Sequence, residues 1–122
     1  MEKGTSFVSS LKVKYKGLSL AKNDYGFSSD IILFQKWAYR VEKGWYGFAL
    51  SDAPNSWATI IDEFLQWLEI QAPDFKIHQI KLKMGSARIY LDLSLFNEGK
   101  VGKINKEIRE LEEWLSHDSL VY

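Results

Sequence analysis

The chain has 122 residues, with 16 acidic and 16 basic side chains, so its formal net charge is zero. Hydrophobic residues make up 46% and aromatic residues 15% of the sequence, which predicts one folded domain over residues 1–122 and excludes a disordered chain. The charge balance excludes a bulk attraction to nucleic acids or membranes, and the lack of cysteine excludes disulfides and thiol chemistry.

No charged start leads into a long apolar run, so the sequence predicts neither a signal peptide nor a membrane span. The expected location is therefore the cytoplasm. Internal repeats and low-complexity tracts are also absent from the sequence, which agrees with a single domain.

Residues 7–22 are predicted to form two short strands. Apolar and lysine side chains alternate here, in the order Leu11, Lys12, Val13, Lys14, Tyr15, Lys16. This period of two is typical of a strand with one buried face. A turn at Lys16 and Gly17 would lead into the second strand, and the turn-forming residues 23–26 would end it.

Residues 31–43 are predicted to form a helix, since residues 28–30 offer good N-caps and Gly44 offers a stop. Apolar side chains recur at helical spacing, at Ile31, Phe34, Ala38 and Val41. The alternation of Trp37, Tyr39 and Val41 leaves a strand open as the alternative.

An aromatic connector follows, in which Trp45, Tyr46 and Phe48 lie around two glycines. Aromatic residues of this kind usually belong to a core or its rim, but glycines beside them can also present a binding loop. Trp45 and Tyr46 are therefore candidate contact residues.

Residues 57–68 carry the most regular helical pattern of the chain. Apolar side chains recur at i, i+3, i+4 and i+7, at Trp57, Ile60, Ile61, Phe64, Leu65 and Leu68. Asn55 or Ser56 could cap this helix, and Pro73 is expected to end it. The apolar stripe needs an apolar partner, for which the following hairpin is suited.

Residues 75–96 are predicted to form a β-hairpin with a type II′ turn at Gly85 and Ser86, since glycine readily adopts the positive φ required there. One face of the hairpin would then be mainly apolar, with His78, Ile80, Leu82, Met84, Ala87, Ile89, Leu91 and Leu93. The other face would be cationic and aromatic, with Ile77, Gln79, Lys81, Lys83, Arg88, Tyr90 and Asp92. In this register Leu82 lies opposite Ile89, and a slip by one residue would mix the two sets.

A last helix is predicted over residues 102–116. Its apolar side is marked by Val101, Ile104, Ile108, Leu111 and Leu115. Its other positions are predicted to form a solvated acidic face, with Glu107, Glu110, Glu112 and Glu113. The whole chain therefore predicts an α+β fold, in which an antiparallel sheet of about four strands carries three helices mainly on one face, in the order ββααββα.

The hairpin sequence resembles a segment of small uncharacterised proteins of bacteria and their phages, which have a Trp-led helix followed by Gln-x-Lys-x-Lys-x-Gly-x-x-Arg-x-Tyr. The matching positions are Gln79, Lys81, Lys83, Gly85, Arg88 and Tyr90. The departures are Leu82 for a usual Glu, Met84 for Phe and Ala87 for Leu. The resemblance covers residues 57–90, under a third of the chain, and implies a bacterial or phage origin and a small α+β domain, without an activity.

The outer face of the predicted hairpin is the main candidate contact surface, with Gln79, Lys81, Lys83, Arg88 and Tyr90. Arg88 could hold a carboxylate or phosphate, and Tyr90 could anchor a protein contact or stack on a base. Strand surfaces often carry solvated lysines that only prevent edge-to-edge pairing, so a purely structural role is the alternative. Lys12, Lys14 and Lys16 would join this surface if the first strand shares the sheet.

Catalytic and metal-binding patterns do not emerge from the sequence. The two histidines, His78 and His117, are far apart and have no spacing that suits a metal pair or a Ser-His-Asp arrangement. Asp62 and Glu63 are adjacent on a predicted helix, so they point to different sides and do not form a carboxylate pair. We expect no catalytic residue, no metal site and no cofactor.

The sequence thus predicts a small, non-enzymatic protein that binds another macromolecule. A protein partner is the first expectation, as for an immunity protein or a phage-encoded inhibitor. Nucleic-acid binding through the cationic face of the sheet is the second, and a small-ligand pocket lined by Trp45, Tyr46 and Trp57 is the third.

Overall fold

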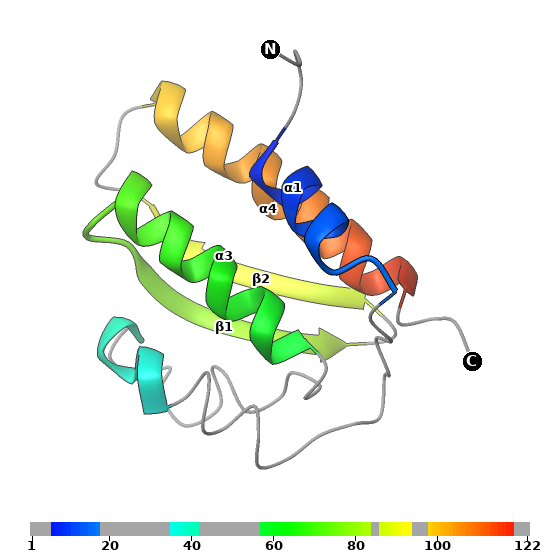
Figure 1. The fold of residues 1–122 in the computed structure, drawn as a ribbon. Coiled ribbons are helices and arrows are strands. Elements are labelled where there is room, and N and C mark those ends of the chain that lie inside the picture. Colours follow the sequence, from blue (N-terminus) through cyan, green and yellow to red (C-terminus); the bar gives the residue numbers. More distant parts are fainter. Residues whose placement is uncertain (1–5, 18–34, 42–56, 84–85, 94–97, 119–122) are drawn as a thin grey trace.

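A β-hairpin covered by helices forms the centre of the computed structural model, which describes residues 6–17, 35–41, 57–83, 86–93 and 98–118 (Figure 1). For residues 81–83 and 117–118 the description is limited to the backbone. The elements, in chain order, are α1 (Phe7–Lys14), the 3₁₀ turn η2 (Ala38–Arg40), α3 (Ala58–Gln71), β1 (Lys76–Lys83), β2 (Ser86–Asp92) and α4 (Glu98–Asp118). The fold class is α+β, as predicted.

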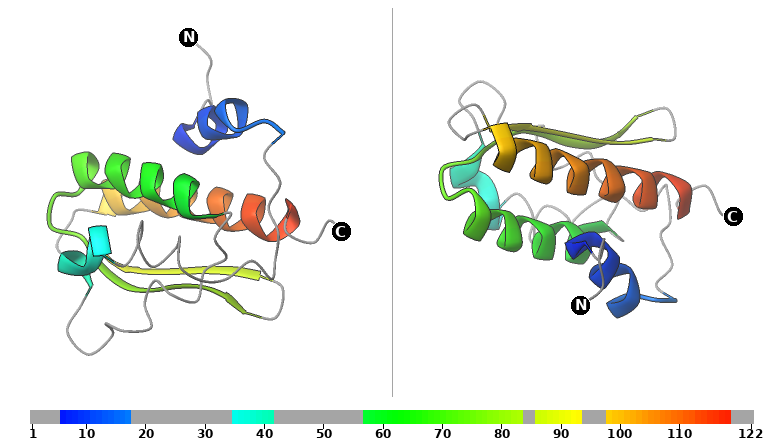
Figure 2. Two further views of the ribbon diagram at one scale, coloured as in Figure 1. Left: turned by 60° about the horizontal axis from the view of Figure 1, so that its bottom comes forward. Right: turned by 90° about the horizontal axis from the view of Figure 1, so that it is seen from above.

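The sheet of the described part has two antiparallel strands, and the three α-helices lie on the same side of it (Figure 2). Helix α3 covers the face of the hairpin, α4 runs beside β2, and α1 lies outside α3 and α4 (Figures 1 and 2). Val41 adds a single parallel bridge to Ile77 of β1. The predicted four strands and the order ββααββα are therefore not found in the described residues.

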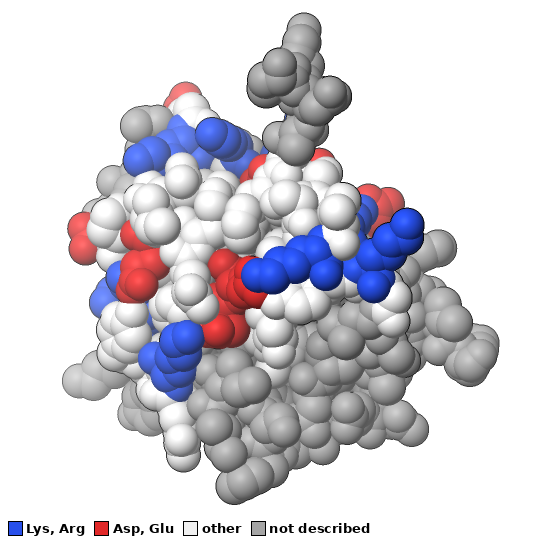
Figure 3. Space-filling view, in the orientation of Figure 1, with Lys and Arg blue, Asp and Glu red and all other residues white. Residues whose placement is uncertain are grey.

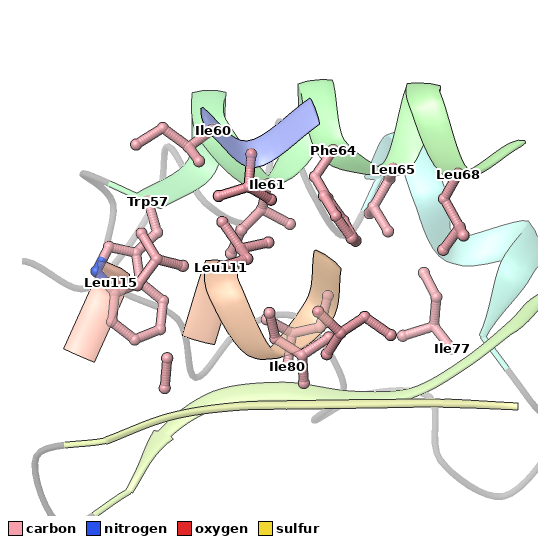
Figure 4. Close-up of a cluster of buried hydrophobic side chains, with 14 of the residues drawn as sticks. Trp57, Ile60, Ile61, Phe64, Leu65, Leu68, Ile77, Ile80, Leu111 and Leu115 are labelled. Carbon is pink, nitrogen blue, oxygen red and sulfur yellow. The ribbon is translucent and has the colours of Figure 1, made fainter. Parts of the chain in front are cut away.

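Helix α3 supplies the largest share of the core. All six residues of its predicted stripe are buried, and Figure 4 shows Ile61, Phe64, Leu65 and Leu68 directed toward the side where Ile77 and Ile80 of β1 and Leu111 of α4 lie. The helix ends at Gln71, and Pro73 follows its C-cap, Ala72. The helical period predicted this element correctly because one continuous stripe faces a single apolar surface. The predicted caps, Asn55 and Ser56, lie outside the described residues.

The hairpin is confirmed, but its predicted register is wrong. Lys83 pairs with Ser86 and Leu82 pairs with Ala87, so the connection consists of residues 84 and 85 instead of Gly85 and Ser86. From Gln79 to Lys83, each residue of β1 therefore pairs with the β2 residue two positions before the predicted one. Because side chains alternate with a period of two, this shift keeps Ala87 and Ile89 on the buried face.

A β-bulge in β1 corrects a second part of that prediction. The register shifts between Ile77 and Gln79, which leaves His78 outside the ladder. One extra residue reverses the alternation before it. Ile77, which was predicted to face outward, is therefore 0% exposed, and His78 is half-buried instead of lying opposite Leu93.

Residues 7–14 form helix α1 rather than the predicted strand. Ser6 caps the helix by accepting a hydrogen bond from the backbone N–H of Ser9 at 2.9 Å. Val8 and Leu11, three residues apart, are the buried side chains, whereas Val13 is 76% exposed. The alternation of apolar residues with lysine in the sequence therefore does not match which side chains are buried. Residues 18–22, the rest of the predicted strands, lie outside the described part.

Two further helical predictions are confirmed in part. Residues 35–40 are helical, as predicted, but Val41 is extended, as in the strand alternative. Residues 31–34 and 42–43 lie outside the described part of the chain. Helix α4 begins at Glu98 and ends at Asp118, so it is longer than the predicted 102–116.

Candidate functional site

The outer face of the hairpin is formed by the residues that alternate with the buried ones. Gln79 pairs with Tyr90, and Lys81 pairs with Arg88, so the four residues form two neighbouring cross-strand pairs. Tyr90 is 41% exposed, whereas Gln79 and Arg88 are partly buried. Lys83, the remaining predicted residue of this face, pairs with Ser86 at the end of the ladder. The structure therefore brings five of the predicted contact residues together on one hairpin.

Helix α4 adds an arginine beside this face, which sequence reasoning missed. Arg88 and Arg109 line one shallow hollow of about 480 Å³, together with Glu112, Glu113 and Ser86. The Nε atom of Arg88 is buried and has no hydrogen-bond acceptor. Since Arg109 is 21 residues or more from the strand residues it approaches, only the tertiary fold could reveal this neighbour.

The open edge of β2 is closed by side chains of α4. The backbone N–H of Ala87 donates to Oγ of Ser116 at 2.6 Å, and the N–H of Ile89 donates to Oε2 of Glu112 at 2.8 Å. Burial raises the pKa of Glu112, and the hydrogen bond from Ile89 opposes that rise. Because these edge donors are already satisfied, α4 takes the place of a neighbouring strand along this part of β2.

The predicted solvated acidic face of α4 is wrong. Glu107 is only 6% exposed and accepts hydrogen bonds from the backbone N–H groups of Phe7 and Val8, at 3.1 and 3.0 Å. Glu110 accepts a hydrogen bond from Oγ of Ser6 at 2.6 Å. These two carboxylates bind the N-terminus of α1, where free N–H groups and the helix dipole favour negative charge. Of the four predicted residues only Glu113 is exposed.

The lysines of residues 12–16 do not join the hairpin. Lys12, Lys14 and Lys16 are exposed on α1 and the turn after it, and α3 and α4 lie between α1 and the sheet (Figure 2). Lys14 also forms an ion pair with Glu63 at 2.9 Å. Trp45 and Tyr46 lie outside the described residues. Trp57 is 0% exposed, so it lines no open surface.

Helix α3 has three carboxylates and no cationic residue, and each carboxylate is paired with a cation from another segment. The pairs are Glu63 with Lys14 at 2.9 Å, Asp62 with Lys36 at 3.0 Å, and Glu69 with Arg40 at 2.7 Å. Asp62 and Glu63 thus point to different neighbours, as their adjacency in the sequence predicts. The sequence pattern does not predict that these carboxylates are neutralised, because their cationic partners are 26 to 49 residues away in the sequence.

Arg40 joins three parts of the chain. Its Nη2 atom donates to Glu69, and its Nη1 atom donates to the carbonyl oxygens of Pro73 and Phe75, the latter at 3.3 Å. The guanidinium also lies 4.6 Å from the ring centroid of Phe75. The 35–41 segment is thereby held against the end of α3 and the start of β1. This polar cluster has a structural role.

The Glu69 cluster gives a pH-dependent prediction. Hydrogen bonds from Tyr39 and then from Arg40 lower the pKa of Glu69, so its contribution to stability is present above pH 4.5, the ordinary pKa, and is lost as pH falls through the lowered pKa. Since Glu69 is 37% exposed, replacing it with glutamine should lower the free energy of unfolding by about 1 kcal/mol at pH 7. Urea unfolding of both proteins at a series of pH values should show this difference vanish in acid. A difference that persists below pH 3 contradicts the assignment.

The described part of the chain contains no cluster of three or more His, Asp or Glu side chains placed to hold a metal ion. Among the described helices none is both long and apolar enough to cross a membrane. His78 is half-buried in the bulge of β1, and the side chain of His117 is not described.

Comparisons with known proteins identify no relative: no protein-family model matches the sequence, and no curated protein or solved structure shows significant similarity to it.

Proposed function

We propose that this chain is a small, non-enzymatic cytoplasmic protein that binds another protein through the outer face of its hairpin. The class of protein that we propose is that of immunity proteins and phage-encoded inhibitors. The basis for proposing a bacterial or phage origin is the partial resemblance of residues 57–90 to small bacterial and phage proteins.

The exposed side chain of Tyr90 is the observation that carries this proposal. Its strand neighbours Ile89 and Ala87 are buried in the core, so Tyr90 lies on a backbone that is fixed by both the ladder and the core. Arg88 lies on the same face, and Lys81 and Gln79 are opposite on β1. Tyrosine and arginine on a rigid surface are the residues that most often dominate protein-binding energies, since they lose little conformational freedom on binding.

The distribution of cations favours a protein partner over nucleic acid. The six cations of the nucleic-acid hypothesis lie on two sides of the molecule, three at α1 and three on the hairpin. Lys14 is neutralised by Glu63, and Arg88 lies in a hollow that also contains two glutamates. A nucleic-acid strand presents a continuous line of phosphates, which needs a continuous line of unpaired cations on the protein. Cations divided between two sides of the molecule therefore support nucleic-acid binding less well than protein binding. Trp57, which was predicted to line a small-ligand pocket, is 0% exposed, so it does not form an accessible pocket wall.

Replacing Tyr90 with alanine tests the proposal. The immobilised chain should capture a specific protein from a lysate of its native host, and Tyr90→Ala should weaken that binding about 30-fold, which corresponds to a loss of about 2 kcal/mol. Arg88→Gln should weaken it as well. Titration of the purified partner by calorimetry measures both effects, and thermal unfolding verifies that the variants remain folded.

Tyr39→Ala is the matched control, because Tyr39 is also an exposed tyrosine but lies beside α3. It should bind the partner as the unaltered chain does. Equal binding by the folded Tyr90→Ala and Arg88→Gln variants would contradict the proposed surface. Recovery of nucleic acid whose affinity falls by about 0.9 log unit per phosphate for each log unit of salt would favour the second function instead.

A further inference from the structure

A second surface, independent of the hairpin, lies where α1 and α3 meet. Phe7, Trp67 and Ile70 line a shallow hollow of about 530 Å³ between these helices, and Lys14, Asp62, Glu63 and Gln66 lie at its polar end. Ile70 is 78% exposed, the largest exposure of a bulky apolar side chain in the described residues. Figure 3 shows this side of the molecule. Uncharged surface lies next to a cluster of acidic side chains, and a cationic side chain reaches this cluster.

The aromatic wall of this hollow is already ordered in the single chain. The rings of Phe7 and Trp67 are stacked, with centroids 5.1 Å apart and planes 9° apart. Phe64 is buried beneath both rings, and its ring centroid lies 6.4 Å from that of Phe7 and 5.5 Å from that of Trp67. Glu107 fixes the position of Phe7 by accepting its backbone N–H. Binding here would therefore cost little side-chain ordering.

The charges around the hollow identify the partner that fits it best. Each carboxylate of α3 is already paired with Lys14, Lys36 or Arg40, so this surface has no unpaired charge of either sign on α3. A strongly charged partner would find no unpaired charge on α3 to bind. A second copy of the chain meets no like-charge repulsion, because the same neutral mixture of apolar groups and ion pairs faces it.

We infer that this surface binds a second copy of the same chain in a two-fold symmetric dimer. Ile70 of each copy packs against the Phe7 and Trp67 rings of the other, which removes two exposed isoleucines and two hollows from water at once. The hairpin face lies on the opposite side of the helices, so the dimer leaves Tyr90 accessible (Figure 2). The inference does not depend on the function proposed above.

Sedimentation equilibrium of the full chain tests this inference. The unaltered protein should approach twice its mass of 14.2 kDa as its concentration is raised. Ile70→Glu should weaken dimerisation at least about tenfold, because it replaces a buried apolar contact with a charge. Since the interface has no net charge, raising the salt concentration should not weaken the unaltered dimer.

Val13→Glu is the matched control. Val13 is 76% exposed on α1 and is not part of the hollow, so the same substitution there should leave dimerisation unchanged. A chain that stays monomeric at every concentration overturns the inference. So does equal weakening by the two variants, or a dimer that salt dissociates.

Discussion

Replacing Phe64 with alanine is expected to lower the free energy of unfolding by about 3–5 kcal/mol, the usual range for removing a buried phenylalanine. Phe64 lies in the middle of α3, is 1% exposed, and contacts the rings of Phe7 and Trp67. The substitution would therefore leave a cavity between α3 and α1 and remove the support of the aromatic stack. Urea unfolding followed by tryptophan fluorescence measures the loss.

The control for this variant is Thr59→Ala. Thr59 is an exposed residue of the same helix, and its replacement should change the free energy of unfolding by no more than about 0.5 kcal/mol. A loss below 1 kcal/mol for Phe64→Ala would show that α3 does not present this side chain to a packed core.

Removal of the Glu107 carboxylate is expected to have the second largest effect. Glu107→Ala leaves the N–H groups of Phe7 and Val8 without an acceptor in a place that is largely closed to water, which should cost about 1–3 kcal/mol. Helix α1 also loses the negative charge at its N-terminus. Because α1 holds Phe7 against Trp67, its loosening should alter the fluorescence of Trp67 at denaturant concentrations where the core is still folded.

Glu113→Ala provides the comparison, since Glu113 is an exposed glutamate of the same helix. It should change stability by less than about 0.5 kcal/mol and leave α1 in place. If the two variants have the same stability, the carboxylate of Glu107 does not hold α1.

The parts of the fold that the sequence predicted are those that depend on local periodicity. The stripe of α3 was correct residue by residue, because all its members face one core. The buried face of β2 was correct even though the register was wrong, because a shift by two positions preserves which side chains point inward. Ile77 was misplaced because a bulge at His78, which no local pattern indicated, reverses the alternation.

The parts that could not be predicted depend on contacts between distant residues. Residues 7–14 have an alternating pattern, but Glu107 supplies a cap for a helix there from about 100 residues away. The glutamates of α4 resembled a solvated face, although Glu112 reaches the edge of β2. The same holds for the candidate sites: the hairpin face follows from alternation, whereas Arg109 beside Arg88 and the neutralised surface of α3 arise only from tertiary packing.

Photocrosslinking from position 90 tests the central claim most directly. Tyr90 is replaced by a photoreactive phenylalanine analogue in the full chain, and Tyr39, an exposed tyrosine that lies outside both the hairpin face and the hollow between α1 and α3, is replaced in a second protein. Irradiation in the native host should yield one specific protein adduct from position 90 and none from position 39. If position 90 yields no adduct, or if both positions yield the same products, the outer face of the hairpin is not the surface through which this protein binds its partner.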